Sequence, residues 1–414
     1  MPITRRALLA APLAAPLATL VPRAARAQTT PTLRLGVLTD LSGPYRDTGG
    51  AGSVAGASQA AAEAMAHFPA LSVEVLQGDH QNKPDIGATI AREWIDRDGV
   101  DAIIAVPNSG VGLAVAQVCR EKDRVFLCSG AATVDLTGAR CAPTTVHWTV
   151  DTFMLASSTG GALVQRGRDT WFLLVADYAF GQTIQRDVTT LVERADGRIA
   201  GAVRYPFPQT TDFSAFLVQA RASGAKVLGL ANAGADTINC IKQAAEFGLP
   251  QSGMSIAALL IFVGDVHALG LPAAQGLLLT ESFYWDLNDR TRAFSSRIAP
   301  RMPANWRPNM EHAGSYGAAL HYLKAAADMG AATAKASGAA TVARMKAMPT
   351  DDDAYGPGRI REDGRLMHPA YLFQVKTPAE STGAWDYYKL VNTTAPEQAA
   401  RTLAEGKCAM LAAK

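Results

Sequence analysis

Six short runs of small polar residues hold the side chains best suited to bind a ligand. They occur at residues 41–45, 107–110, 129–133, 177–181, 232–236 and 263–265, and each follows a predicted strand. Their Ser, Thr, Asn and Gly residues supply hydroxyl and backbone N–H groups, which bind carboxylates, helped by the dipole of a following helix. One such run is typical of an ordinary turn. Six of them at the carboxyl ends of strands favour a binding cleft.

Aromatic residues accompany these runs. Tyr45, Tyr178 and Phe180 lie within them, and Phe262 directly precedes the last one. Since aromatic rings offer large apolar surfaces, we expect these four side chains to form apolar walls of the cleft.

Motifs for nucleotide binding and catalysis are missing from the sequence. The glycines at 50–56 are spaced G-x-G-x-x-x-G, and ten residues separate them from the strand predicted at 33–39, whereas a dinucleotide-binding loop needs G-x-G-x-x-G directly after its strand. The S-x-x-K match at 223–226 falls in a turn, and neither G-x-S-x-G nor H-E-x-x-H occurs. No His or Cys spacing indicates a metal site. The sequence therefore predicts a protein that is not an enzyme and that uses neither cofactor nor metal.

Predicted strands and helices alternate along the first part of the chain. The strands are expected at 33–39, 72–77, 101–106 and 124–128, and the helices at 53–68, 84–97 and 112–122. The helix at 53–68, for example, places Val54, Ala57 and Ala61 on one face. This alternation predicts an α/β fold with a parallel sheet covered by helices on both faces.

The same pattern begins again at residue 170. Strands at 170–176, 198–205, 226–231 and 255–262 alternate with helices at 182–195, 213–223 and 237–247. Two similar halves predict two doubly wound parallel-sheet lobes. The chain is expected to cross between them at 146–151 and 276–282, followed by a long helix at 310–327 in the first lobe, a loop at 349–358, and a hairpin that pairs 369–376 with 385–391.

The expected division of the chain follows from these elements. Lobe 1 comprises 28–147 and 282–348, lobe 2 comprises 148–281 and 349–391, a C-terminal tail covers 392–414, and a signal peptide covers 1–27.

The first 27 residues have the composition of an export signal. Arg5 and Arg6 precede an apolar stretch at 7–21 that is too short to span a bilayer, and Ala25-Arg26-Ala27 gives the small residues that a signal peptidase requires. The paired arginines suggest the twin-arginine export route to the periplasm. Cleavage removes four arginines and changes the net charge from +2 to −2. The remaining charge indicates neither nucleic acid nor an anionic membrane as a partner.

The five cysteines fall into two groups. Cys119, Cys128 and Cys240 lie in apolar helix or strand runs, and we expect them to be buried thiols. Cys141 and Cys408 lie in loop-like contexts, and the periplasm permits disulfides. We predict a Cys141–Cys408 disulfide that ties down the tail.

The sequence resembles a known family, the type I periplasmic solute-binding proteins of ABC importers, of the Leu/Ile/Val-binding kind. The matching segments are 36–44, Asp79 before the helix at 84, 126–136, 178–181 and 211–213. The resemblance covers nearly the whole mature chain. It implies two lobes joined by a three-crossover hinge, which close on a small ligand and then dock on a membrane permease that works with ATPase subunits.

The resemblance also implies ligand contacts. They fall on Tyr45, Asn108, Ser109, Ala131, Thr133, Phe180, and Asn232 to Gly234. Amino-acid binders of this family place an acid in the second lobe for the ligand's ammonium group, and the residue that aligns here is Asp265. Phe180 stands where amino-acid binders have Tyr, so the site looks less suited to a zwitterion.

The ligand is expected to be a small carboxylate. Segments 146–149, 286–289 and 385–390 resemble a branch of the family tied to aromatic acids, which makes an aromatic acid the leading expectation and a hydrophobic or branched-chain amino acid the alternative. In our hypothesis the loop from Ser129 to Thr133 donates hydrogen bonds to the carboxylate, and the apolar body rests on Tyr45, Phe180 and Phe262. We expect a monomer. An exported sensory module and, less favoured, an exported α/β enzyme are the alternative functions.

Overall fold

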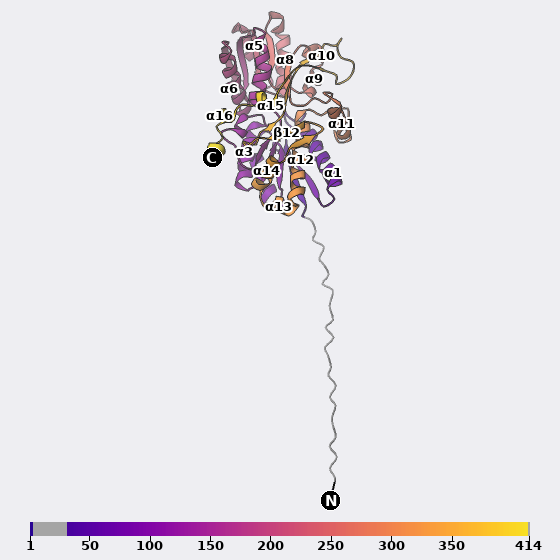
Figure 1. The fold of residues 1–414 in the computed structure, drawn as a ribbon. Coiled ribbons are helices and arrows are strands. Elements are labelled where there is room, and N and C mark those ends of the chain that lie inside the picture. The colour runs from indigo at the N-terminus through magenta and orange to yellow at the C-terminus, as the bar shows by residue number, and fades with distance from the viewer. Residues whose placement is uncertain (3–30, 413–414) are drawn as a thin grey trace.

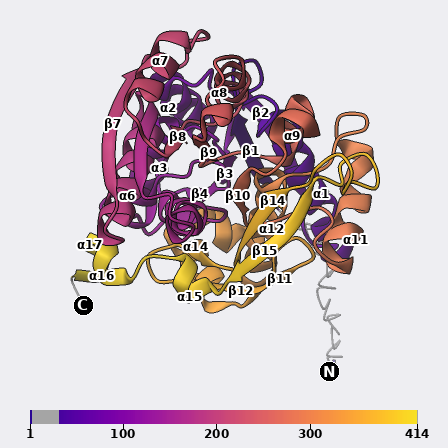
Figure 2. The same ribbon diagram turned by 90° about the horizontal axis from the view of Figure 1, so that it is seen from above.

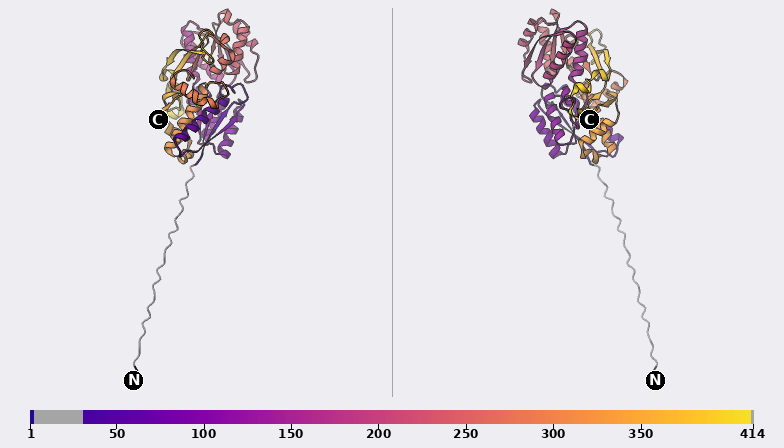
Figure 3. Two further views of the ribbon diagram at one scale, coloured as in Figure 1. Left: turned by 90° about the vertical axis from the view of Figure 1, so that its right-hand side faces the viewer. Right: turned by 60° about the vertical axis from the view of Figure 1, so that its left-hand side comes forward.

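The computed structural model describes residues 1–2 and 31–412, and it contains two α/β lobes stacked on one another (Figure 1). The predicted signal peptide lies outside the described residues except for its first two, so it stays a prediction. Lobe 1 carries α1, α3 and α12, and lobe 2 carries α6 and α8 (Figure 3 gives two further views). No helix among the described residues is long and apolar enough to cross a membrane.

Lobe 1 is built on a parallel sheet with the strand order β2-β1-β3-β4-β5. The strands are β1 (Leu33–Thr39), β2 (Val73–Asp79), β3 (Ala102–Ala105), β4 (Val125–Cys128) and β5 (Thr145–His147). Leu35 and Val37 pack with α1 (Gly50–His67) and α12 (Met310–Met329), whereas Leu38 packs on the opposite side with α2 (Pro84–Glu93) and α3 (Ser109–Glu121). Both faces are thus buried, which explains the nearly continuous apolar sequence of the strands.

Lobe 2 repeats this design with the strand order β7-β6-β8-β9. The strands are β6 (Thr170–Ala176), β7 (Arg198–Tyr205), β8 (Val227–Ala231) and β9 (Ser255–Ala258). Leu173 and Val175 pack on α6 (Ala179–Arg194), and Phe172 and Leu174 pack with α7 (Ser214–Ala222) and α8 (Ala235–Glu246). Shorter helices complete the lobe: α4 (Thr152–Leu155), α5 (Gly161–Gln165), α9 (Val263–Leu269) and α10 (Leu271–Ala274). The prediction of two doubly wound parallel-sheet lobes is confirmed.

A third sheet is antiparallel and has the order β10-β14-β15. It contains β10 (Leu278–Glu281), β14 (Ala370–Val375) and β15 (Tyr388–Thr394). The predicted C-terminal hairpin is therefore confirmed, and its second strand extends to Thr394, three residues further than predicted.

The prediction of a plain loop at 349–358 is wrong. This segment forms β11 (Thr350–Asp352) and most of β12 (Gly356–Ile360), which pair antiparallel and continue to β13 (Leu366–Met367). The reason is a tight turn, because Asp352 Oδ1 accepts hydrogen bonds of 2.8 Å from the backbone N–H groups of Ala354 and Tyr355. Gly356 follows with a φ of 71°, which a glycine adopts without strain.

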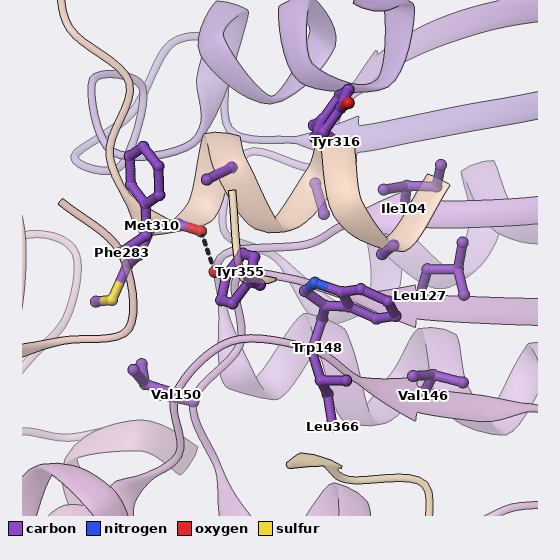
Figure 4. Close-up of a cluster of buried hydrophobic side chains, with 14 of the residues drawn as sticks. Ile104, Leu127, Val146, Trp148, Val150, Phe283, Met310, Tyr316, Tyr355 and Leu366 are labelled. Carbon is purple, nitrogen blue, oxygen red and sulfur yellow. Dashed lines mark hydrogen bonds between the residues drawn. The ribbon is translucent and has the colours of Figure 1, made fainter. Parts of the chain in front are cut away.

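The chain crosses between the lobes three times: between β5 and α4, between β10 and α11 (Asp289–Ile298), and between β13 and β14. Trp148 of the first crossing is fully buried against Tyr355, near Leu366 and the sheet residue Leu127 (Figure 4). Tyr355 in turn donates a 2.8 Å hydrogen bond to the carbonyl of Met310, where α12 begins. This packing links the first crossing to β13, where the third crossing begins, and to the start of α12.

Several helices begin earlier than the sequence predicted. Helix α1 starts at Gly50 instead of 53, α3 at Ser109 instead of 112, and α6 at Ala179 instead of 182. Strand β9 ends at Ala258, four residues before the predicted end. The polar runs of the sequence are therefore partly helix N-termini, and residues 259–262 lie beyond their strand.

The C-terminal tail runs along one side of both lobes (Figure 2). It carries α15 (Pro396–Ala399), α16 (Leu403–Gly406) and α17 (Ala409–Ala412), and lobe 1 is completed by α13 (Ala331–Ala336) and α14 (Gly338–Ala347). The predicted Cys141–Cys408 disulfide is present, and Glu405 forms a 3.7 Å ion pair with Arg194 of α6. Cys119, Cys128 and Cys240 are buried free thiols, as predicted.

Candidate ligand-binding site

A small cavity of about 10 Å³ lies where the two lobes meet, at the carboxyl ends of both parallel sheets. Its lining comes from loops and helix starts of both lobes: Tyr45, Thr48, Pro107, Ser109, Gly130, Ala132, Tyr178, Phe180, Ala233, Leu260, Phe262 and Glu311. Open α/β sheets bind ligands outside the carboxyl ends of their strands. The position of the cavity is thus the one that the fold favours for a ligand.

A larger hollow of about 450 Å³ lies between α6 and the C-terminal tail. Most of its charged side chains already have partners, since Arg194 pairs with Glu405, and Arg186 pairs with Asp135 and Asp187. We therefore place the candidate site in the smaller cavity.

The wall from lobe 1 is polar at the start of α3. Asn108 Oδ1 accepts a 3.1 Å hydrogen bond from Val111 N and so fixes the first turn, which leaves Ser109 as the first helical residue. Ser109 is only 1% exposed, and its Oγ has no hydrogen-bond partner among the described residues. The first N–H groups of a helix also have no partner within it. This end of the cavity therefore offers hydrogen-bond donors that suit an anion.

The wall from lobe 2 is mostly apolar. It consists of Tyr178 and Phe180 at the start of α6, Ala233, and Leu260 and Phe262 beyond β9. Such a wall suits the aliphatic or aromatic part of a ligand.

The two lobes are in contact around the cavity. The hydroxyl groups of Tyr45 and Tyr178 share a hydrogen bond of 2.6 Å, and Phe207 stacks on both rings, with centroid distances of 5.4 and 4.5 Å. Burial, as the largest cause, raises the pKa of both tyrosines well above 10, so both phenols are neutral. This contact closes one side of the cavity.

Glu311 is the acidic residue of the lining, and the sequence analysis did not single it out. It is 4% exposed, and its Oε2 has no hydrogen-bond partner in the described part of the chain. Burial, followed by the charge of Asp265, raises the pKa of this carboxyl group well above 4.5. A signal existed in the sequence, because Glu311 is an acid in the first turn of a helix in which small and apolar residues predominate.

Two further buried acids belong to this region, Asp265 next to Glu311 and Glu281 next to Asp265, and both have donors. Asp265 Oδ2 accepts a 3.0 Å hydrogen bond from Phe262 N at the start of α9, and burial raises the pKa of Asp265 to about 7. Glu281 Oε1 accepts a 3.2 Å hydrogen bond from the Tyr388 hydroxyl, and burial raises the pKa of Glu281 well above 4.5. Glu311 therefore differs from its two acidic neighbours in lacking a donor.

Comparison with known proteins agrees with this arrangement of two lobes around a cavity. A family profile described as periplasmic binding protein matches residues 32–384. The chain belongs to the periplasmic binding protein family. A search of curated proteins found no significant match.

Solved structures of other periplasmic binding proteins have the same fold. One from Burkholderia mallei is 42% identical, with a TM-score of 0.85, over 91% of this chain and 98% of that one. A branched chain amino acid ABC transporter periplasmic ligand-binding protein from Burkholderia xenovorans LB400 is 37% identical, with a TM-score of 0.79, over 92% and 100%. An ABC transporter solute-binding protein from R. palustris, in complex with 4-hydroxybenzoate, is 21% identical, with a TM-score of 0.79, over 89% and 98%.

Four of the predicted contact residues line the cavity of this periplasmic binding protein, namely Tyr45, Ser109, Phe180 and Phe262. The other predicted residues of lobe 1 lie beside it. Asn108 caps α3, Ser129 Oγ shares a 2.8 Å hydrogen bond with Ser315 Oγ, and the carbonyl of Ala131 faces the thiol of Cys128. Thr133 Oγ1 lies 3.3 Å from Thr183 Oγ1 of lobe 2.

The remaining predicted residues of lobe 2 also lie outside the lining. Asn232 Oδ1 accepts a 2.7 Å hydrogen bond from Thr237 Oγ1, and Asp265 caps α9. Gly234 has a φ of 59°, and a Cβ there would lie 2.7 Å from the carbonyl oxygen of Pro44 in lobe 1. These three residues shape the loops around the cavity, and their contact with a ligand stays a prediction.

Proposed function

We propose that this periplasmic binding protein is the solute-binding component of an ABC importer and captures a small ligand by closure of its two lobes. The observation that carries the proposal is the cavity between the lobes, which has unpaired polar groups at one end and apolar rings at the other. The protein's own role is to bind, orient and release the ligand unchanged.

The proposed ligand has a carboxylate and an apolar body. Its carboxylate would take hydrogen bonds from Ser109 Oγ and the N–H groups that begin α3, and charge-assisted bonds of this kind contribute about 1.5–3 kcal/mol each. Its apolar body would lie against Phe180 and Phe262, where burial of about 150 Å² contributes at most about 4 kcal/mol. The names of the related structures support this class, because one refers to branched-chain amino acids and another to 4-hydroxybenzoate.

Closure follows from where the contacts lie. Donors of lobe 1 bind the ligand first, and contacts from Tyr178 and Phe180 of lobe 2 exist only in the closed form. A ligand that gains contacts only in one state shifts the population toward that state. The closed form would then dock on the permease, which works with its ATPase subunits.

We propose that the protein acts in the periplasm and reaches it through the signal peptide at 1–27. The paired arginines of that peptide favour the twin-arginine route. The proposed unit is a monomer. An exported sensory module would use the same cavity, and a partner screen separates the two functions, since an importer component binds a permease and stimulates its ATPase.

The proposal is tested by thermal-shift screening of the mature protein against branched-chain and aromatic amino acids and aromatic carboxylates, followed by calorimetry of the hits. We expect one class to raise the melting temperature by mass action and to be recovered unaltered by mass spectrometry. Chemical conversion of the bound compound would contradict a pure binding role, and the absence of any stabilising compound would contradict the ligand class.

A further inference from the structure

We propose that Glu311 selects the ligand by accepting hydrogen bonds from an ammonium group, so that the cavity favours an amino acid over the same molecule without its amino group. This inference rests on the proposed function, because it names the ligand chemistry of that same cavity. It assigns the cationic end of the site to α12 of lobe 1, whereas the sequence analysis expected Asp265 of lobe 2.

The argument begins with the missing partner of Glu311. An unpaired carboxyl group in a protein interior is costly, and nearly all buried polar groups have a partner. The N-terminus of α12 does not supply one, because the N–H groups of Glu311 and His312 bond to Asn309 Oδ1 at 2.9 and 3.1 Å. A donor group on a ligand would satisfy the carboxyl group.

The charges around Glu311 favour a cationic donor. The described lining of the cavity contains no Lys, Arg or His. The adjacent His312 packs against Gly52 of α1, and burial lowers its pKa to about 4, so it is uncharged. The charged group that approaches Glu311 from α9 is the acid Asp265, and Glu281 of β10 lies beside Asp265. A ligand carboxylate placed here would disfavour the ionised form of Glu311 further, whereas an ammonium group favours that form and pairs with it.

The acid also lies next to the anion-binding end of the cavity. Gly49 lies between the two, because a Cβ atom at this glycine would be 3.3 Å from Glu311 Oε2 and 3.2 Å from Pro107 Cγ. Pro107 is two residues before Ser109, whose hydroxyl lacks a partner. A carboxylate acceptor and the anion donors of α3 are therefore neighbours on one wall, as the adjacent ammonium and carboxylate groups of an α-amino acid require.

The test is calorimetric titration of the mature protein with two matched pairs of compounds, L-leucine with 4-methylpentanoate and L-phenylalanine with 3-phenylpropanoate. In at least one pair we expect the amino acid to bind at least tenfold more tightly than its counterpart. Glu311→Gln should weaken binding of that amino acid at least tenfold and leave the counterpart unchanged or tighter. Glu93→Gln, which changes an exposed acid on α2 of the same lobe, is the control and should have no effect.

The other outcomes overturn the inference. Tighter binding of the counterparts, with the same affinities in Glu311→Gln as in the wild type, would mean that a protonated Glu311 donates a hydrogen bond to a carboxylate. In that case the proposed function would stand and the inference would fail. Binding of no compound in either pair, while other aromatic carboxylates do bind, overturns the inference alone. Glu311→Asp keeps the charge and should retain part of the preference, which excludes a folding defect as the cause of the loss.

Discussion

The hydroxyl groups of Tyr45 and Tyr178 lie 2.6 Å apart, one on each lobe, and form a direct polar contact across the cavity. Because its two partners are on different lobes, this hydrogen bond belongs to the closed arrangement and is lost when the lobes separate. It lies beside the lining that we assign to the ligand, so closure and binding are coupled at this point.

We predict that Tyr178→Phe weakens ligand binding about fivefold or more. The change leaves the Tyr45 hydroxyl without its partner and destabilises the closed form by about 1 kcal/mol, and a smaller closed population lowers the apparent affinity in proportion. Calorimetry with the best ligand of the thermal-shift screen measures the effect. Tyr371→Phe on β14, outside the cavity, is the matched control, and equal affinities of the two variants would disprove the coupling.

Two serines with similar sequence contexts should behave differently. Ser109→Ala removes an unpaired hydroxyl in the cavity wall, so we expect at least a fivefold loss of affinity and little change in melting temperature. Ser129→Ala breaks the 2.8 Å bond to Ser315, so we expect a loss of about 1 kcal/mol of stability and an affinity within twofold of wild type. The reverse pattern would indicate that the ligand carboxylate binds at the loop after β4 and not at the start of α3.

The sequence predicted the order of strands and helices well because apolar strand runs and helix periodicity are local signals. It also predicted the Cys141–Cys408 pair, since the three other cysteines lie in apolar runs. The turn at Asp352 was missed, because a Pro, Gly and Asp-rich segment looks the same whether or not its flanks pair as strands.

Glu311 shows what local patterns cannot give. In the sequence it is one charged residue in the long helix predicted for lobe 1, and its placement in the cavity arises from the return of α12 to lobe 1 beside the loop before α3. Similarly, Ser129 and Ser109 look equivalent as polar residues after strands, and the tertiary partner Ser315 distinguishes them.

We predict that replacement of both Cys141 and Cys408 by Ser lowers the free energy of unfolding by about 2–5 kcal/mol. The disulfide closes a long loop, with a sequence separation of 267 between the two cysteines, and so restricts the unfolded chain. Chemical denaturation of the double variant measures the loss, and the wild type under reducing conditions is the control. Equal stability of the oxidised wild type and the double variant would disprove a stabilising role.

Glu311→Gln should also make the stability of the ligand-free protein less dependent on pH. The raised pKa of Glu311 means that the folded protein keeps a proton that the unfolded chain has released. This carboxyl group therefore costs stability increasingly as the pH rises from 4.5 toward the folded pKa, by up to about 1.4 kcal/mol per pH unit. Thermal unfolding from pH 5.5 to 8.5 should give a flatter profile for the variant than for the wild type.

Other groups that titrate in this range affect both proteins alike. Glu281 keeps its raised pKa, and buried histidines such as His312 and His368 keep their lowered ones. The difference between the two profiles thus reports Glu311 together with its coupling to Asp265, and parallel profiles would contradict the assignment of Glu311 as a buried, unpaired acid.

The most direct test of the central claim, capture of a ligand by closure of two lobes, is small-angle X-ray scattering of the mature protein with and without its best ligand. The account predicts that the radius of gyration of the free protein exceeds the value calculated from the closed structure described here, and that saturating ligand lowers it to that value. Identical scattering curves, with ligand binding verified by calorimetry in the same buffer, would contradict the account.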